Sequence, residues 1–131
     1  MKYLYCDSCF LITSYQEKYL ELLAQYKNQF FISNLQIKDE LIKPKELADK
    51  VRKCLTVIEE NEEIIAKANE LLEINKALSF YDCLCLAFCI IDGYCLITDD
   101  KHLIKKSNDY NVQTKQTNEI IDEFHLKKEN N

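Results

Sequence analysis

Glycine, proline and arginine are nearly absent from this 131-residue chain, which contains one of each. Gly93 and Pro44 are therefore expected at helix boundaries, since glycine ends helices in a left-handed conformation and proline suits the first position of a helix. With Arg52 as its one arginine and a net charge of −5, the chain lacks the overall basic character typical of nucleic-acid-binding proteins. An anionic ligand would need a metal ion or a local group of lysines.

Long apolar runs are absent too. The longest, 83–91, is far shorter than the roughly 20 residues that span a bilayer, so we predict no membrane partner. The apolar start of the chain is interrupted by Asp7, and no cleavage pattern of a secretory signal follows it. Seven cysteines, an odd number in mostly apolar surroundings, are typical of buried thiols in a reducing compartment. We therefore expect a cytoplasmic protein.

Short apolar strands alternate with helices along the chain. The pattern favours strands at 3–6, 30–32, 94–97 and 111–114. Such alternation predicts an α/β fold with a mostly parallel sheet of four or five strands, flanked by helices. A chain of 131 residues suits one domain. We place that domain at residues 1–126, followed by a polar C-terminal tail at 127–131.

One segment has two interpretations. Apolar residues recur at helical spacing in 45–59 and again in 64–72, which predicts an amphipathic helical hairpin. A strand at 55–58 is the alternative. Exposed apolar faces on such a hairpin would allow the chain to form a homodimer.

Most of the residues that could take part in a reaction or bind a ligand surround the apolar run 83–91. This run predicts a helix buried on nearly all sides, ended by Gly93 and followed by a strand. Asp82 lies directly before the run, and Asp99 and Asp100 directly follow the strand. This helix-strand unit therefore carries acids at both of its ends.

Each acid taken alone also has a structural explanation. Asp7, after the first strand, is a favoured helix N-cap, and Asp82 fits the spacing of a capping box. Glu40 alone would be a solvated helix residue. Asp99 and Asp100 alone would form a polar turn that caps the next helix.

Their joint pattern suggests a site. Functional groups of an open parallel sheet gather at the carboxyl ends of its strands, where Asp7 and the pair Asp99-Asp100 fall. Like charges brought together raise one another's pKa unless a cation neutralises them. Carboxylates without a histidine or cysteine ligand set suit Mg²⁺ or Mn²⁺ rather than zinc. Such a site supports metal-assisted attack of water on a phosphodiester.

Four short motifs follow one another along the chain: the strand ending in Asp7-Ser8, the segment ISxxxxxxEL ending in Glu40-Leu41, the block YDCLCLAFC before Gly93, and the LIT-x-Asp ending at Asp100. In this order they resemble the motifs of the PIN domain family and, within it, of the VapC-like toxin ribonucleases. The resemblance covers nearly the whole chain. It implies a parallel sheet flanked by helices, with acids that bind Mg²⁺ or Mn²⁺ and cleave single-stranded RNA.

The resemblance also implies a set of site residues. The catalytic and metal-binding acids would be Asp7, Glu40, Asp82 and Asp100, with Ser8 and Thr98 as supporting hydroxyl groups. Asp99 is an alternative metal ligand beside Asp100, and Asp39 raises the same ambiguity of register beside Glu40. The positive charge for RNA binding would come from Lys38, Lys101 and Lys105.

Partners and competing hypotheses follow from the same motifs. Besides RNA, a toxin ribonuclease would have an antitoxin protein as its partner. The second hypothesis is a catalytically inactive PIN-like module that binds a metal ion or a protein. Two other acidic α/β folds are disfavoured: a response-regulator receiver needs paired acids after its first strand, and a haloacid-dehalogenase-type phosphatase needs Asp-x-Asp, but Ser8 and Cys9 occupy those positions.

Overall fold

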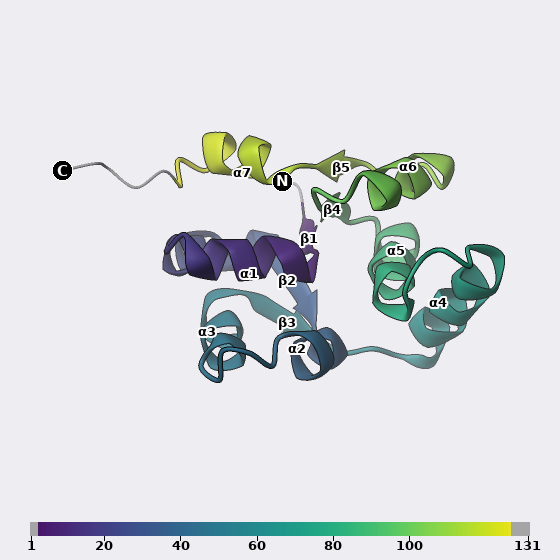
Figure 1. The fold of residues 1–131 in the computed structure, drawn as a ribbon, viewed down its shortest axis with the longest axis horizontal. Coiled ribbons are helices and arrows are strands. Elements are labelled where there is room, and N and C mark those ends of the chain that lie inside the picture. The colour runs from purple at the N-terminus through teal and green to yellow at the C-terminus, as the bar shows by residue number, and fades with distance from the viewer. Residues whose placement is uncertain (1–2, 127–131) are drawn as a thin grey trace.

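The computed structural model describes residues 3–126 and has helices on both sides of one sheet (Figure 1). Every strand pairing in this sheet is parallel, and the strand order is β3-β2-β1-β4-β5. The strands are β1 (Leu4–Cys6), β2 (Phe30–Ser33), β3 (Thr56–Ile58), β4 (Cys95–Ile97) and β5 (Thr114–Lys115). The predicted α/β fold with a mostly parallel five-stranded sheet is confirmed.

The helices cover the two faces of this sheet. They are α1 (Ser8–Gln16), the 3-10 segment η1 (Leu20–Gln29), α2 (Asn34–Glu40), α3 (Leu47–Cys54), α4 (Glu62–Ile74), α5 (Phe80–Asp92), α6 (Lys101–Asp109) and α7 (Thr117–Glu123). In Figure 1, α1 and α3 lie on one side of the strands, and α4 and α5 lie on the other.

The central strand β1 contributes side chains to two separate hydrophobic cores. Leu4 and Cys6 pack into the core under α1, α3 and α7, whereas Tyr5 packs into the core under α4 and α5. This division follows from the two-residue period of a strand, which turns successive side chains to opposite faces. All three residues are fully buried, as expected for the middle strand of a parallel sheet covered on both faces.

Helix α5 forms as its sequence predicts. Ser79 caps its first turn in a reciprocal capping box with Asp82, and Gly93 ends it with a left-handed φ of 78°. The run between these signals is apolar or cysteine, and every residue from Cys83 to Cys89 is buried. The helix therefore lies between the sheet and α4, and its N-terminus is at the carboxyl edge of the strands.

The two helices predicted across 45–73 form as α3 and α4, but their arrangement as a hairpin is wrong, because the alternative strand is confirmed between them. Thr56, Val57 and Ile58 form β3, which pairs with β2 and separates α3 from α4. These three residues are β-branched, which favours a strand over a helix. They are only half-buried at the edge of the sheet, so their apolar spacing resembles that of a helix face.

Other boundaries shift by a few residues. Pro44 lies in the exposed turn between α2 and α3 instead of opening a helix, because α3 begins at Leu47. The last strand is at Thr114–Lys115, at the sheet edge as expected but later than the predicted 111–114. The predicted polar tail at 127–131 lies outside the described residues.

The strand order creates one special position in the sheet. From β1 the chain proceeds through β2 to β3 in one direction, and it later adds β4 and β5 on the other side. The crevice at such a switch point is where open α/β sheets place ligands. Among residues 3–126, no helix is long and apolar enough to cross a membrane.

Candidate functional site

Asp7 lies at this switch point, directly after β1. Its carboxylate occupies the N-cap position of α1 but makes no side-chain capping bond. Instead, Asp7 Oδ2 accepts a hydrogen bond of 2.8 Å from the hydroxyl of Thr98, at the end of the neighbouring strand β4. Asp7 is only 8% exposed. Asp7 is therefore the N-cap of α1 by position, as the local explanation predicted, but its buried carboxylate bonds to the end of β4 instead of capping the helix.

Asp99 and Asp100 follow the same strand but have different partners. Asp100 is the N-cap of α6, where its Oδ1 accepts from the backbone N–H groups of His102 and Leu103. Asp99 accepts from both the backbone N–H and the hydroxyl of Thr117, at 2.8 and 2.5 Å. Asp99 therefore ties the end of β4 to the start of α7, which leaves Asp100 as the acid beside Asp7.

Glu40 ends α2 and approaches the site from a second direction. Its Oε1 accepts a 2.7 Å hydrogen bond from the hydroxyl of Ser8, the residue after Asp7. The neighbouring Asp39 instead accepts a hydrogen bond from the Tyr81 hydroxyl on α5, and this bond raises the pKa of Tyr81 to about 12. Asp39 and Glu40 thus have different partners, and Glu40 is the one bonded to the residue after Asp7.

Asp82 is at the third residue of α5 and is half-buried. Its Oδ2 accepts from the backbone N–H of Ser79 at 3.1 Å, which completes the capping box. The local explanation for Asp82 is therefore confirmed. Its charge nevertheless acts on the site, because it raises the pKa values of both Asp7 and Glu40.

Electrostatic effects on pKa connect Asp7 and Glu40 with the other predicted acids. Burial raises the pKa of Asp7 and the nearby charges of Asp82 and Asp100 raise it further, against the lowering effect of the Thr98 hydrogen bond. Burial likewise raises the pKa of Glu40, which the charges of Asp7 and Asp82 reinforce against the Ser8 bond.

Cys9 is a second marker of this convergence, and its place beside the acids was not predicted. The Cys9 side chain is exposed on α1, two residues after Asp7. After partial burial, the causes that raise its pKa are the charges of four acids: Asp7, Glu40, Asp100 and Asp82. Four separate chain segments therefore bring negative charge to one place, which we call the acid cluster (Asp7, Glu40, Asp82 and Asp100).

The donor chemistry of the acid cluster fits a hard divalent cation. Its groups are carboxylate oxygens with hydroxyls beside them, the ligands that Mg²⁺ and Mn²⁺ prefer. Mutual repulsion in a partly buried setting is also what a cation would relieve. Within residues 3–126, however, no three histidine, cysteine, aspartate or glutamate side chains are grouped closely enough to hold a metal ion. Asp82 and Asp100 are engaged in helix caps.

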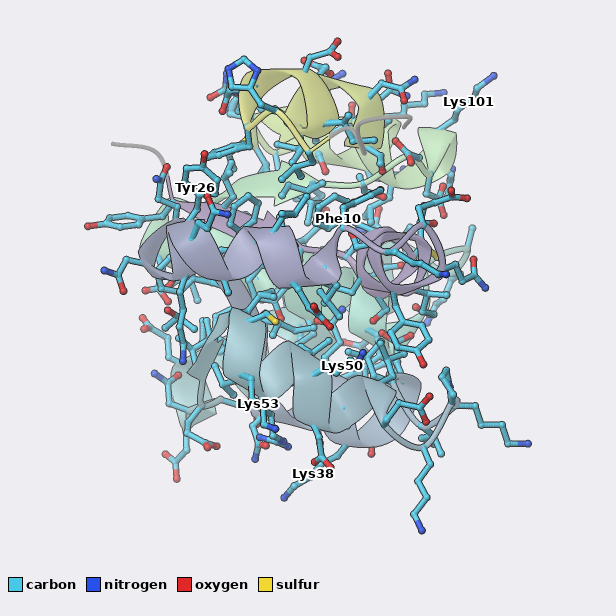
Figure 2. All side chains as sticks on the ribbon, turned by 90° about the vertical axis from the view of Figure 1, so that its left-hand side faces the viewer. Phe10, Tyr26, Lys38, Lys50, Lys53 and Lys101 are labelled. Atoms are coloured by element: carbon cyan, nitrogen blue, oxygen red, sulfur yellow. The ribbon has the colours of Figure 1, made fainter. Side chains whose placement is uncertain are left out.

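The three predicted RNA-binding lysines do not form one patch. Lys38 is exposed on α2, and Lys101 and Lys105 are exposed on α6. Figure 2 shows Lys101 near the top of the molecule and Lys38 near the bottom. A role in RNA binding would therefore involve two separate contact points, one on each side of the switch point.

Sequence reasoning missed Gln36, a fully buried polar residue on α2. Its Nε2 donates a 2.8 Å hydrogen bond to the hydroxyl of Ser8, which in turn donates to Glu40. The available signal was spacing, because residues four apart lie on the same face of a helix and Gln36 precedes Glu40 by four. A polar residue on the buried face of a helix next to a candidate acid indicates a hydrogen-bond partner for that acid.

The raised pKa values predict a pH-dependent stability of the metal-free protein. Groups whose pKa is higher in the folded state stabilise the fold fully below their unfolded pKa, about 4 for Asp and Glu, and this contribution is lost as pH rises through the folded pKa. Asp7 and Glu40 both belong to this class. We therefore expect the double variant Asp7→Asn/Glu40→Gln to be more stable than the wild type at pH 7 and to lose that advantage toward pH 4.

Urea unfolding in EDTA at several pH values between 4 and 7 measures this difference. The variant serves as the reference for all other titrating groups, which the two proteins share. An advantage that is constant across this range, or that grows toward pH 4, would contradict the interpretation that the two carboxylates are destabilised by burial and by each other.

Comparison with known proteins identifies the family to which this chain belongs. The sequence model of the PIN domain matches residues 12–108, nearly three-quarters of the chain. The protein therefore belongs to the PIN domain family. PIN domains are generally nucleases and usually use divalent metals, so membership of this family supports a nuclease function in general terms.

Solved structures support the same fold. The crystal structure of PAE2754 from Pyrobaculum aerophilum superposes with a TM-score of 0.73, covering 96% of this chain and 97% of that one. Sequence identity between the two is 14%, so the likeness concerns the fold. No curated protein sequence matches the chain significantly.

Proposed function

We propose that this protein is a metal-dependent endoribonuclease that cleaves phosphodiester bonds of single-stranded RNA with Mg²⁺ or Mn²⁺ as its cofactor. One observation carries the proposal: at the switch point of a PIN domain, acids from four separate segments lie close enough for their charges to raise the pKa of Cys9, and the pKa values of Asp7 and Glu40 are raised by acids of the same group. A fold gains nothing in stability from such repulsion. A site that binds a cation does need these charges.

Each acid of the cluster has a hydrogen-bond donor that restricts its orientation. Thr98 holds Asp7, and Ser8 holds Glu40. Backbone N–H groups hold Asp82 and Asp100 at the starts of α5 and α6. Donors of this kind reduce the conformational entropy that the carboxylates lose on binding a ligand, and the same principle orients ligands in protein metal sites.

In the proposed reaction, the cation and the residues of the chain have different roles. When bound, the cation supplies a water of lowered pKa and a positive charge beside the phosphodiester. Asp7, the most buried acid, provides a fixed anchor, and Thr98 keeps its Oδ2 in place. The negative net charge of the whole chain makes the cation and local lysines the sources of attraction for RNA.

The pair Asp100→Asn and Asp99→Asn tests the assignment within the site. Asparagine is as good an N-cap as aspartate, so Asp100→Asn keeps the start of α6 while removing one charge from the cluster. We expect this variant to lose RNA cleavage by about a hundredfold or more, with its melting temperature nearly unchanged. Asp99→Asn is expected to keep cleavage and to lose about 1–2 kcal/mol of stability, because its partner is Thr117.

The assay uses mixed single-stranded RNAs with purified protein, comparing Mn²⁺ and Mg²⁺ with EDTA. Metal-dependent cleavage that is lost in Asp100→Asn and kept in Asp99→Asn supports both the reaction and the choice of ligand. The reverse pattern would reassign the ligand to Asp99. Folded wild-type protein that cleaves no RNA under any of these conditions would rule out the nuclease proposal.

A second candidate is a catalytically inactive PIN-like module that binds a metal ion or a protein. The helix caps favour it: Asp82 and Asp100 are engaged as capping groups, and no ready grouping of three ligands exists among residues 3–126. The two candidates differ in turnover. A rise in melting temperature with Mn²⁺ but no RNA cleavage would select the inactive module.

Finer features of the proposed function concern partners. We propose that the chain acts as the toxin of a toxin–antitoxin pair, with an antitoxin protein that suppresses cleavage. Cells whose growth is equally unaffected by expression of the wild type and of Asp7→Asn would contradict this.

We also propose a homodimer, in which Ile74 at the end of α4, 66% exposed in the single chain, contributes to the interface. Light scattering that gives a monomer mass at all concentrations would exclude the dimer.

A further inference from the structure

A chain of four hydrogen bonds runs through the interior and ends at the acid cluster. The backbone N–H of Ser33 donates to the Tyr5 hydroxyl at 3.1 Å, and that hydroxyl donates to Gln36 Oε1 at 2.7 Å. Gln36 Nε2 then donates to the Ser8 hydroxyl at 2.8 Å, and Ser8 donates to Glu40 Oε1 at 2.7 Å. We call these five residues the relay.

The bonds of the relay run in one direction, which gives the backbone N–H and each hydroxyl an acceptor. A backbone N–H can only donate, so the Tyr5 oxygen accepts from Ser33 and has its single proton left to give. The Gln36 atom that accepts the hydrogen bond from Tyr5 is the amide oxygen, so the amide nitrogen is turned toward Ser8. Ser8 accepts from that nitrogen, and its one proton is therefore directed to Glu40.

Burial keeps water from replacing the hydrogen-bond partners within the relay. Tyr5 and Gln36 are fully buried, and Ser8 is 4% exposed. The Tyr5 ring is stacked on Phe88 of α5, with centroids 5.2 Å apart and planes 18° from parallel. The thiol of Cys85 also lies 3.6 Å from Gln36 Oε1 as a weak donor, which is consistent with an oxygen in that position. The orientation of the relay is thus set by the packed core.

Polar side chains at these positions call for an explanation. Tyr5 is in the middle of the central strand, where both faces are covered and apolar side chains are the rule. Burying a phenol and an amide is unfavourable unless their hydrogen bonds are satisfied, and an apolar pair could fill the same space without that requirement. What the polar pair adds is an orientation of the Ser8 hydroxyl, whose hydrogen bond is directed to one particular oxygen of Glu40.

We propose that Tyr5 and Gln36 are positioning residues for the acid cluster: they direct the Ser8 hydroxyl onto Glu40 and so hold that carboxylate ready for a divalent cation. This inference rests on the proposed function of the cluster. Neither residue touches the cation or RNA. Their effect reaches Glu40 through Ser8, in the way that partners behind metal ligands orient those ligands.

A double-mutant cycle on Mn²⁺ affinity tests the relay. Tyr5→Phe removes one hydroxyl and keeps the ring that stacks on Phe88, so the fold is expected to persist. We expect it to weaken Mn²⁺ binding, measured by titration calorimetry, about tenfold, at the lower end of what loss of such partners costs. In a Ser8→Ala background the relay is already cut, and Tyr5→Phe should then change the affinity less than about twofold.

The matched control is Tyr94→Phe, which removes a hydroxyl from the same aromatic group. The Tyr94 ring lies 6.0 Å from that of Tyr5, but Tyr94 is not part of the relay. Its replacement should leave Mn²⁺ affinity unchanged. Equal losses for Tyr5→Phe in both backgrounds would indicate a general structural effect and overturn the relay, as would no loss in the wild-type background.

A measurement on the metal-free protein separates failure of the relay from failure of the proposed function. The side-chain amide protons of Gln36 are visible by ¹⁵N NMR, and we expect them to exchange slowly and to shift in both Tyr5→Phe and Ser8→Ala. Unchanged Gln36 signals in these variants would overturn the relay. Gln36 signals that shift in both variants, in a protein that binds no Mn²⁺, would overturn the cation site. The orientation of Glu40 by the relay would then still stand.

Discussion

Replacing Asp7 with asparagine is expected to lower metal-dependent RNA cleavage by about a thousandfold or more. Cations contribute several kcal/mol of transition-state stabilisation at sites of this kind, and about 1.4 kcal/mol corresponds to a factor of ten in rate. Asp7 is the most buried member of the acid cluster and is influenced by both Asp82 and Asp100. Its loss therefore removes the central charge of the proposed site.

The asparagine variant is a clean test because it changes little else. The Thr98 hydroxyl, which now donates to Asp7 Oδ2, can donate to the amide oxygen in the same position. Because burial and neighbouring charges raise the pKa of Asp7, the variant should be at least as stable as the wild type at pH 7. Single-turnover cleavage rates and a thermal melt in EDTA measure the two effects.

Asp92→Asn serves as the control for charge alone. Asp92 is an exposed acid at the far end of α5, so its replacement alters the net charge equally without touching the cluster. We expect cleavage to be unchanged in this variant. Similar losses in Asp7→Asn and Asp92→Asn, or cleavage by Asp7→Asn at close to the wild-type rate, would mean that catalysis does not occur at the switch point.

The largest expected effect on stability comes from Phe88. This side chain is 2% exposed, belongs to the core under α5 and stacks on the Tyr5 ring of β1. Truncating a buried phenylalanine to alanine costs about 3–5 kcal/mol, through lost transfer free energy and the cavity left behind. Phe88→Ala should therefore lower the free energy of unfolding by that amount in urea titrations.

Phe80→Ala provides the matched comparison on the same helix. Phe80 is half-buried at the start of α5, so the same truncation should cost less than about 2 kcal/mol. If both variants lost similar stability, the core under α5 would not depend on Phe88 as its packing indicates. A folded Phe88→Ala protein should also bind Mn²⁺ more weakly, since the ring that supports Tyr5 is gone.

The parts of the site that could be predicted from sequence are those set by local signals. Asp7 and the pair Asp99-Asp100 were placed at one edge of the sheet because they follow strands, and parallel strands bring their carboxyl ends to one edge. The capping box of Asp82 was visible in its three-residue spacing from Ser79. Such features depend on residues close together in the chain, and the sequence carries them directly.

The parts that could not be predicted depend on distant partners. Asp99 and Asp100 are adjacent, and only the contact of Asp99 with Thr117 separates their roles. Asp39 and Glu40 are likewise distinguished by Tyr81 and Ser8. Residues 55–58 had both a helix and a strand interpretation, because the half-buried edge position of β3 gives it the apolar spacing of a helix face. In each case tertiary contacts decided between locally equal alternatives.

The separation of the four acids along the chain has a consequence for protein synthesis. Asp7, after β1, and Glu40, at the end of α2, are made early, whereas Asp82 in α5 and Asp100 after β4 are made late. β4 pairs directly with β1, so this side of the crevice does not exist until residues near 100 have left the ribosome. Because chains emerge N-terminus first, a growing chain carries an incomplete acid cluster. Under the proposed ribonuclease function, the nascent protein would therefore not cleave the messenger from which it is being translated.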